Sequence, residues 1–62
     1  MNNEMVSIVV VNYNGKELLK GVLDSVYNLS YRNYEIILVD NASSDGSVDF
    51  VMKNYKKVKI VQ

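Results

Sequence analysis

Two short runs of aliphatic residues constrain the fold of this chain more than any other feature of its sequence. Residues 6–11 read VSIVVV and residues 34–39 read YEIILV, with almost no alternation between apolar and polar positions. Such runs are typical of strands that are buried on both faces, as in parallel sheets. Residues 58–61 (VKIV) form a third, shorter run. The pattern therefore predicts three strands in a parallel sheet.

Two stretches with helical periodicity lie between these runs. Their apolar positions are Leu18, Leu19, Val22, Val26 and Leu29 in the first stretch and Val48, Val51, Met52 and Tyr55 in the second. We expect Asn14 to cap the first helix together with Glu17, three residues later, as in a capping box. We expect Asp45, or Ser44 before it, to cap the second helix.

The order of these elements predicts an α/β fold, a three-stranded parallel βαβαβ sheet with right-handed crossovers and strand order 3-2-1. This order places both helices on one face of the sheet. Ile8 and Val10 point to one face, and Val9 and Val11 point to the other. One face is left bare, although parallel sheets are normally covered on both sides. We therefore expect residues 1–62 to be a single partial domain, or a module that forms a homodimer through the bare face.

The composition excludes several kinds of site. The chain has no cysteine and no histidine, which excludes disulfides, thiolate metal sites and serine hydrolase triads within these residues. Its seven basic and seven acidic residues cancel, so no nucleic-acid partner is expected. Gly15, Gly21 and Gly46 form neither a G-x-G-x-x-G motif nor a P-loop, so a dinucleotide site is not expected either.

The sequence contains no signal for membrane insertion. No apolar run approaches the ~20 residues of a membrane span, and residues 1–4 lack the basic start of a signal peptide. We expect a cytoplasmic protein, whose longer parent could still be membrane-associated.

Asp40 is the most informative polar residue, because it directly follows the second apolar run. In open parallel sheets, ligands bind outside the carboxyl ends of the strands. Asp40 could accept hydrogen bonds from a base or a ribose at this edge. It could equally be a turn residue that accepts hydrogen bonds from the backbone N–H groups of the following loop. The sequence pattern alone favours neither interpretation.

Tyr13 is expected at the same edge, one residue beyond Asn12 at the end of the first run. An exposed aromatic ring there could stack on a nucleobase, a contact worth ~1–3 kcal/mol per base. Alternatively, the ring packs over its own loop. Asn12 and Asn14 could also meet a ligand, although capping alone accounts for Asn14. A strand-end Asp also occurs in receiver-type phosphoacceptor domains, but this chain has Asn12 and Asn14 where those domains have an acidic pair.

Two segments together, residues 6–15 (VSIVVVNYNG) and 35–47 (EIILVDNASSDGS), closely resemble the opening of family 2 glycosyltransferases. The resemblance extends from Met5 onward and is strongest to the rhamnosyltransferase-like members. It implies a GT-A fold, with residues 1–62 as its N-terminal, Rossmann-like and nucleotide-binding part. It also implies transfer of a sugar from a nucleotide-sugar donor.

The resemblance implies a binding role for five residues. Asp40 matches a strand-end aspartate that contacts the nucleoside of the donor, and Tyr13 matches an aromatic position beside the base. Val11 and Asn12 match the strand end that lines this pocket. Asn41 stands where many members have a second aspartate. Together these residues predict a site for a UDP- or dTDP-type nucleotide sugar.

Catalysis in this family needs two further groups. A D-x-D-type motif on a later strand holds Mg²⁺ or Mn²⁺ on the diphosphate, and a carboxylate deprotonates the acceptor hydroxyl. Neither has a counterpart among these 62 residues, so we expect no catalytic residue and no metal ligand in this chain. The segment should bind the donor but be inactive by itself. The alternative is a non-catalytic folding fragment or a self-associating α/β module.

Overall fold

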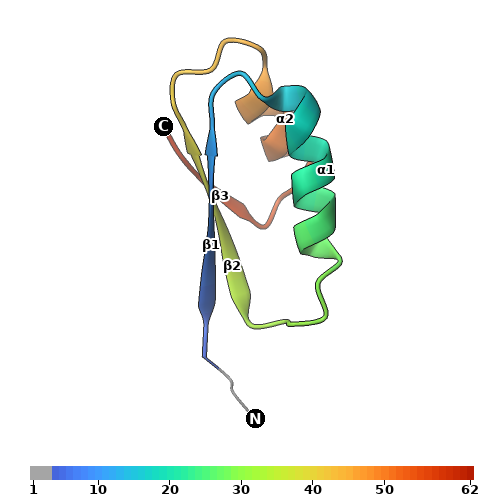
Figure 1. The fold of residues 1–62 in the computed structure, drawn as a ribbon. Coiled ribbons are helices and arrows are strands. Elements are labelled where there is room, and N and C mark those ends of the chain that lie inside the picture. The colour runs from blue at the N-terminus through green and yellow to red at the C-terminus, as the bar shows by residue number, and fades with distance from the viewer. Residues whose placement is uncertain (1–3) are drawn as a thin grey trace.

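The computed structural model describes residues 4–62, and its elements follow the predicted order (Figure 1). Strands and helices alternate along the chain: β1 (Val6–Asn12), α1 (Lys16–Tyr27), β2 (Tyr34–Asp40), α2 (Ser47–Asn54) and β3 (Val58–Val61). Each predicted strand is confirmed, and the first two extend one residue further, to Asn12 and Asp40. The predicted α/β class is therefore correct.

The sheet has the predicted parallel topology. Its order is β1-β2-β3, which is the predicted order 3-2-1 read from the other edge. The register aligns Val10 with Leu38 and Leu38 with Ile60. It also places Asn12 opposite Asp40 at the carboxyl ends of β1 and β2. The loops that follow these two strands therefore leave the sheet at the same edge (Figure 1).

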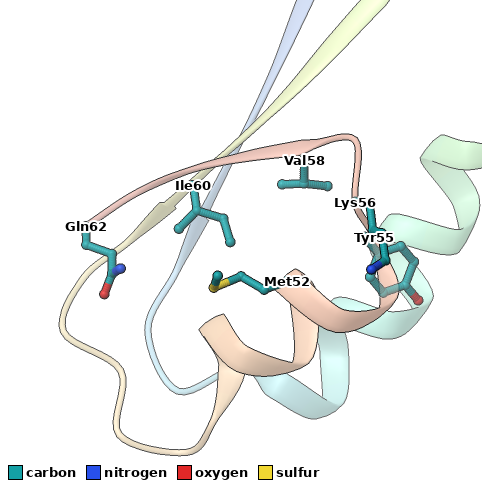
Figure 2. Close-up of a pocket in the computed structure, with 6 residues that line it drawn as sticks. All are labelled: Met52, Tyr55, Lys56, Val58, Ile60 and Gln62. Carbon is teal, nitrogen blue, oxygen red and sulfur yellow. The ribbon is translucent and has the colours of Figure 1, made fainter.

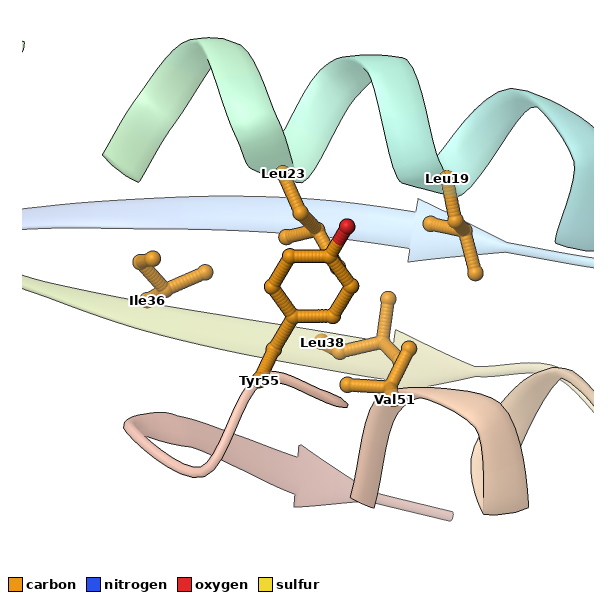
Figure 3. Packing of buried hydrophobic residues seen from close by; sticks show 6 residues of the cluster. All are labelled: Leu19, Leu23, Ile36, Leu38, Val51 and Tyr55. Carbon is orange, nitrogen blue, oxygen red and sulfur yellow. The ribbon is translucent and has the colours of Figure 1, made fainter. Parts of the chain in front are cut away.

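Both helices cover the same face of the sheet, as the strand order predicted (Figure 1). Burial of an aliphatic or aromatic side chain stabilises a fold by about 1.5–3 kcal/mol. The side chains buried in this core are Leu19, Leu23, Ile36, Leu38, Val51 and Tyr55 (Figure 3). Within residues 4–62, neither helix is long and apolar enough to cross a membrane.

The buried stripes of the helices are narrower than the sequence pattern predicts. Leu18 is 77% exposed and Met52 is 59% exposed, although the spacing predicts both on the apolar face. Leu19 and Leu23, one turn apart, are buried instead (Figure 3). A helix that packs on one layer buries only the stripe facing that layer, so the flanking apolar positions remain in solvent.

Tyr55 joins the end of α2 to α1. Its ring lies edge-on to that of Tyr27, with the ring centroids 5.3 Å apart. Its hydroxyl donates a hydrogen bond of 2.7 Å to Oδ1 of Asp24. This bond, together with burial and the charge of Asp24, raises the pKa of Tyr55 to about 12. Loss of the proton would remove the hydrogen bond and place two negative charges side by side.

The opposite face of the sheet is bare. Val9, Val11 and Val61 on this face are 57%, 73% and 51% exposed. Toward the amino ends of the strands, Lys59 donates a hydrogen bond of 2.9 Å to Oε1 of Glu35. This face therefore has an apolar area near the carboxyl edge and a charged pair near the other end.

Leu23 is fully buried where α1 meets the sheet, so its truncation should leave a cavity. We predict that Leu23→Ala lowers the free energy of unfolding by about 2–5 kcal/mol, the range found for buried leucines. Leu18→Ala, on the same helix but 77% exposed, is the matched control and should change it by less than about 0.5 kcal/mol. Urea denaturation followed by circular dichroism measures both. Equal losses would contradict the packing of α1 described above.

Candidate functional site

A buried polar pair joins the carboxyl ends of β1 and β2. Asn12 donates a hydrogen bond of 2.9 Å from Nδ2 to Oδ1 of Asp40. Both residues are only 5% exposed. Directly beyond the pair, the backbone N–H of Asn41 donates to the carbonyl of Asn12 at 2.8 Å. Because buried polar groups need hydrogen-bond partners, this pair determines how the two strand ends meet.

Asp40 also uses its carboxylate to hold its own loop. Oδ1 accepts a hydrogen bond of 2.7 Å from the Ser43 hydroxyl, and Oδ2 accepts one of 2.9 Å from the Ser43 backbone N–H. The hydrogen bonds from Asn12 and then from Ser43 hold the pKa of Asp40 below its ordinary value, because they stabilise the charged form. The structure thus shows the turn role that the sequence left open. A ligand contact by Asp40 stays a prediction.

Ser43 is the residue whose importance the sequence analysis missed. Its hydroxyl donates to Asp40 and accepts hydrogen bonds from Nδ2 of Asn12 (3.1 Å) and from the backbone N–H of Asn14 (2.8 Å). A hydroxyl has one donor and two acceptor sites, so all of them are occupied. The short spacing from Asp40 could have suggested the contact within the loop. The other two contacts span 31 and 29 positions of sequence, and no local pattern indicates them.

Asn14 does not cap α1 as the sequence predicted. The N-cap residue is Gly15. Asn14 has a left-handed backbone conformation, with φ at 50°, and its Oδ1 accepts a hydrogen bond of 2.7 Å from the backbone N–H of Ser44. Asn adopts this conformation more readily than most residues. Because the side chain turns toward the loop that follows β2, the predicted capping box with Glu17 is wrong.

Three of the five predicted site residues face solvent at this edge. Val11 is 73% exposed and Tyr13 is 66% exposed, and Asn41 is exposed as well. They lie beside the buried pair of Asn12 and Asp40. An aliphatic side chain, an aromatic ring and an amide together offer a stacking surface and a group that both donates and accepts hydrogen bonds. The structure therefore brings all five residues together, three on the surface and two beneath it.

Two hollows in the surface lie outside this group of residues. One of about 540 Å³ lies at the start of α1, and its lining includes Lys16 and Asp45. The other, of about 400 Å³, is a groove between α2 and β3 lined by Met52 and Ile60, among others (Figure 2). Neither hollow is lined by any of the five predicted residues. The candidate site is therefore an open edge of the sheet.

The residues at this edge do not fit a metal ion. Within the described part of the chain, no cluster of three or more Asp, Glu, His or Cys side chains could hold one. The carboxylates of Asp40 and Asp45 also accept hydrogen bonds from the protein. Asp40 accepts them from Asn12 and Ser43, and Asp45 accepts them from Lys16 and Ser47. Mg²⁺ and Mn²⁺ are held by several oxygen ligands at once, and Asp40 and Asp45 do not form such a cluster with a third acidic side chain of the described residues. We therefore assign no metal ligand to Asp40 or Asp45.

The profile of the family described as "Glycosyl transferase family 2" matches residues 7–62 of the chain. The matched region contains both strand ends and both loops of the candidate site. The chain belongs to glycosyl transferase family 2. The family resemblance noted in the sequence is therefore confirmed over nearly the whole chain.

Three bacterial relatives share this region. The UDP-Glc:alpha-D-GlcNAc-diphosphoundecaprenol beta-1,3-glucosyltransferase WfaP of Escherichia coli is 36% identical over 50 residues, which cover 81% of this chain and 20% of the relative. The poly(ribitol-phosphate) beta-glucosyltransferase of Bacillus spizizenii is 43% identical over 54 residues, which cover 84% of this chain and 8% of the relative. An uncharacterized glycosyltransferase of Haemophilus influenzae is 36% identical over 62 residues, 100% of this chain and 25% of the relative.

This family 2 chain thus spans a quarter or less of the length of these relatives. Two of the three relatives are named as glucosyltransferases. The narrower resemblance to rhamnosyltransferase-like members finds no support in these matches.

The buried pair can be tested by a substitution that preserves its shape. We predict that Asn12→Asp lowers the free energy of unfolding at neutral pH by about 1–3 kcal/mol, because it places a carboxylate oxygen where Nδ2 now donates to Asp40. The loss should shrink as the pH falls, since a proton shared by the two carboxylates restores a hydrogen bond. Urea denaturation at neutral and at acidic pH measures it.

Asn14→Asp is the matched control for this substitution. The Asn14 side chain is exposed and acts as an acceptor for the N–H of Ser44, a role that a carboxylate also fills. Its stability should therefore stay close to that of the wild type at both pH values. If the two variants lose equal stability, or if the loss in Asn12→Asp does not depend on pH, the description of the pair is wrong.

Proposed function

We propose that residues 1–62 form the nucleoside-binding half of the donor site in a glycosyl transferase domain. The parent enzyme transfers a sugar from a UDP- or dTDP-type nucleotide sugar to an acceptor hydroxyl. The observation that carries the proposal is the exposure of Val11, Tyr13 and Asn41 beside the buried pair of Asn12 and Asp40. Family membership supports a nucleotide-sugar donor, and the name of the WfaP relative includes UDP-Glc.

The exposed and the buried residues have different roles in this proposal. The ring of Tyr13 stacks on the base, and Val11 extends the apolar surface beside it. The amide of Asn41 donates to and accepts from the edge of the base. Asn12 and Asp40 hold these groups in place. Oδ2 of Asp40 accepts one hydrogen bond within the protein, which leaves it one further lone pair for an N–H or hydroxyl of the nucleoside.

We further propose that residues 1–62 bind the donor without catalysing the transfer. Transfer needs a cation to stabilise the diphosphate leaving group and a base to take the proton of the acceptor hydroxyl. Among the described residues, no cluster of three or more Asp, Glu, His or Cys side chains could hold such a cation. In the family pattern, the metal motif and the base follow later strands, and the parent enzyme would hold Mg²⁺ or Mn²⁺ there.

A titration of the ¹⁵N-labelled chain with UDP tests the nucleoside site. We expect the amide signals of Tyr13, Asp40 and Asn41 to shift at millimolar UDP, and less with ADP at the same concentration. Tyr13→Ala should weaken UDP binding by ~5-fold or more, because it removes a stacking contact of ~1–3 kcal/mol.

Tyr31→Ala is the matched control, because Tyr31 is also an exposed aromatic residue. Its hydroxyl donates a hydrogen bond to the carbonyl of Glu4, away from the carboxyl edge of the sheet. It should bind UDP as tightly as the wild type. If the signals of Tyr13, Asp40 and Asn41 do not respond to UDP, the proposed nucleoside site is absent.

The bare sheet face favours a second candidate function, self-association. Val9, Val11 and Val61 give this face exposed aliphatic surface. Strands ~4.8 Å apart with a rise of ~3.3 Å per residue give a face of roughly 300 Å², so two copies packed face to face would bury about 600 Å². Stable interfaces bury about 1,200–2,000 Å². We therefore propose a dimer through this face only as a weak association at high protein concentration.

Sedimentation velocity over a concentration series tests this alternative. The wild type should begin to associate only at the high end of the series, and Val9→Lys should abolish the association by placing a charge on the apolar face. Leu18→Lys makes the same change at an exposed position of α1 and should leave the association unchanged. A wild-type chain that stays monomeric throughout excludes self-association through this face.

A further inference from the structure

Asp45 forms hydrogen bonds with the first residues of both helices. Its Oδ2 accepts a hydrogen bond of 3.0 Å from the backbone N–H of Lys16, where α1 begins. Its Oδ1 accepts one of 3.0 Å from the backbone N–H of Ser47, where α2 begins, and another from the Ser47 hydroxyl. The sequence predicted Asp45, or Ser44 before it, as the cap of α2, but Gly46 is the N-cap residue, and Asp45 bonds to Ser47 from the position before it. The contact with α1 was not predicted.

Both contacts are favourable for the same physical reason. The first N–H groups of a helix have no partner within the helix, and this end carries a partial positive charge. One half-buried carboxylate satisfies such a group on each helix. The hydrogen bonds from Ser47 and Lys16 also keep the pKa of Asp45 below its ordinary value, because they stabilise the charged form.

The backbone beside Asp45 is shaped for this double contact. Gly46 follows it with φ at 84°, a left-handed conformation that glycine adopts without the steric cost of a side chain. The turn at Gly46 lets α2 begin at Ser47, two residues after Asp45, so the carboxylate lies between the two helix starts.

The contact between Asp45 and Lys16 closes one end of the two loops that carry Tyr13 and Asn41. At the other end, the N–H of Asn41 donates to the carbonyl of Asn12. The loops are therefore joined both where they leave the strands and where they enter the helices. Asn41 belongs to the first of these points and Tyr13 directly follows it, and Asn14 joins the loops between the two points through Ser43 and Ser44.

We propose that Asp45 is a positioning residue for the donor nucleoside. By tying the start of α1 to the start of α2, and together with the hydrogen bonds of Asn14 to the other loop, it sets the separation of the two loops, so that Tyr13 and Asn41 face the same ligand. Asp45 does not touch the nucleoside itself, because its oxygens are bound to Lys16 and Ser47 and it lines the hollow at the start of α1. This role rests on the proposed function of the edge.

Asp45→Asn removes the link between the two helix starts but keeps a hydrogen bond to one of them. An amide has a single acceptor oxygen, and its NH₂ group cannot accept a hydrogen bond. Whichever way the Asn side chain turns, one helix keeps its contact and the other loses it. The variant therefore breaks the bridge between Lys16 and Ser47 while it retains a cap on one side.

Asp49→Asn is the matched control. Asp49 is exposed in the first turn of α2, so the substitution removes the same charge from the same helix end and leaves the bridge intact. If Asp45→Asn does not fold, Asp45→Ser replaces it in every comparison. A serine hydroxyl can still accept a hydrogen bond from the start of α2, but it has one short side-chain oxygen and does not reach both helices.

Three quantities are measured for the wild type and each variant by nuclear magnetic resonance. They are the amide shifts of Tyr13 and Asn41 in the free protein, the nuclear Overhauser contacts between the two loops, and the dissociation constant of UDP corrected for the folded fraction. We expect Asp45→Asn to change the first two and to weaken UDP binding by ~10-fold, because small displacements of contact groups are costly. Asp49→Asn should match the wild type in all three.

The outcomes distinguish this role from a general effect on stability and from a failure of the proposed function. If the free-protein signals of Tyr13 and Asn41 in Asp45→Asn match the wild type, the positioning role is overturned whether or not UDP binds. An unchanged dissociation constant for the folded fraction overturns it as well. If the wild type does not bind UDP but Asp45→Asn still shifts Tyr13 and Asn41, the proposed function fails while the control of loop spacing by Asp45 is upheld.

Discussion

The hydrogen bond between Asn12 and Asp40 is the contact on which the rest of the carboxyl edge depends. It joins residues 28 positions apart in the sequence, at the point where two parallel strands end. Both side chains are buried, and a buried carboxylate without partners is far more costly than an exposed one. The pair also holds Ser43, and Ser43 in turn holds the N–H of Asn14. The strand ends therefore hold both loops where they leave the sheet.

This arrangement explains why the polar residues of the edge are not equivalent. Asn12 and Asp40 are hydrogen-bonded inside the protein, whereas Tyr13 and Asn41 directly beside them are exposed. A site that must recognise a ligand benefits from side chains held in place by others, because less freedom is lost on binding. Membership of glycosyl transferase family 2 is consistent with an edge built in this way.

The two faces of the sheet differ for a reason that lies in the connections between strands. Each crossover in the order β1-β2-β3 is made in the same direction, so α1 and α2 fall on one side. The face with Val9 and Val11 is left in solvent. Val11 belongs both to this bare face and to the edge with Tyr13, so the candidate site borders the uncovered part of the sheet. Whatever covers this face would also approach the proposed nucleoside site.

The sequence alone determined the strands, the helices, their order and the family, because these follow from local periodicity and from two short motifs. It also located the edge at which Val11, Asn12, Tyr13, Asp40 and Asn41 meet, since parallel strands place their carboxyl ends together. Only the tertiary structure decided what each side chain does there. The partners of Asn14, Ser43 and Asp45 on the opposite loop or strand end lie 29 to 31 positions away, so no local pattern could indicate these contacts. The exposure of Leu18 was likewise decided by which side of α1 meets the sheet, a property of packing that helical spacing leaves open.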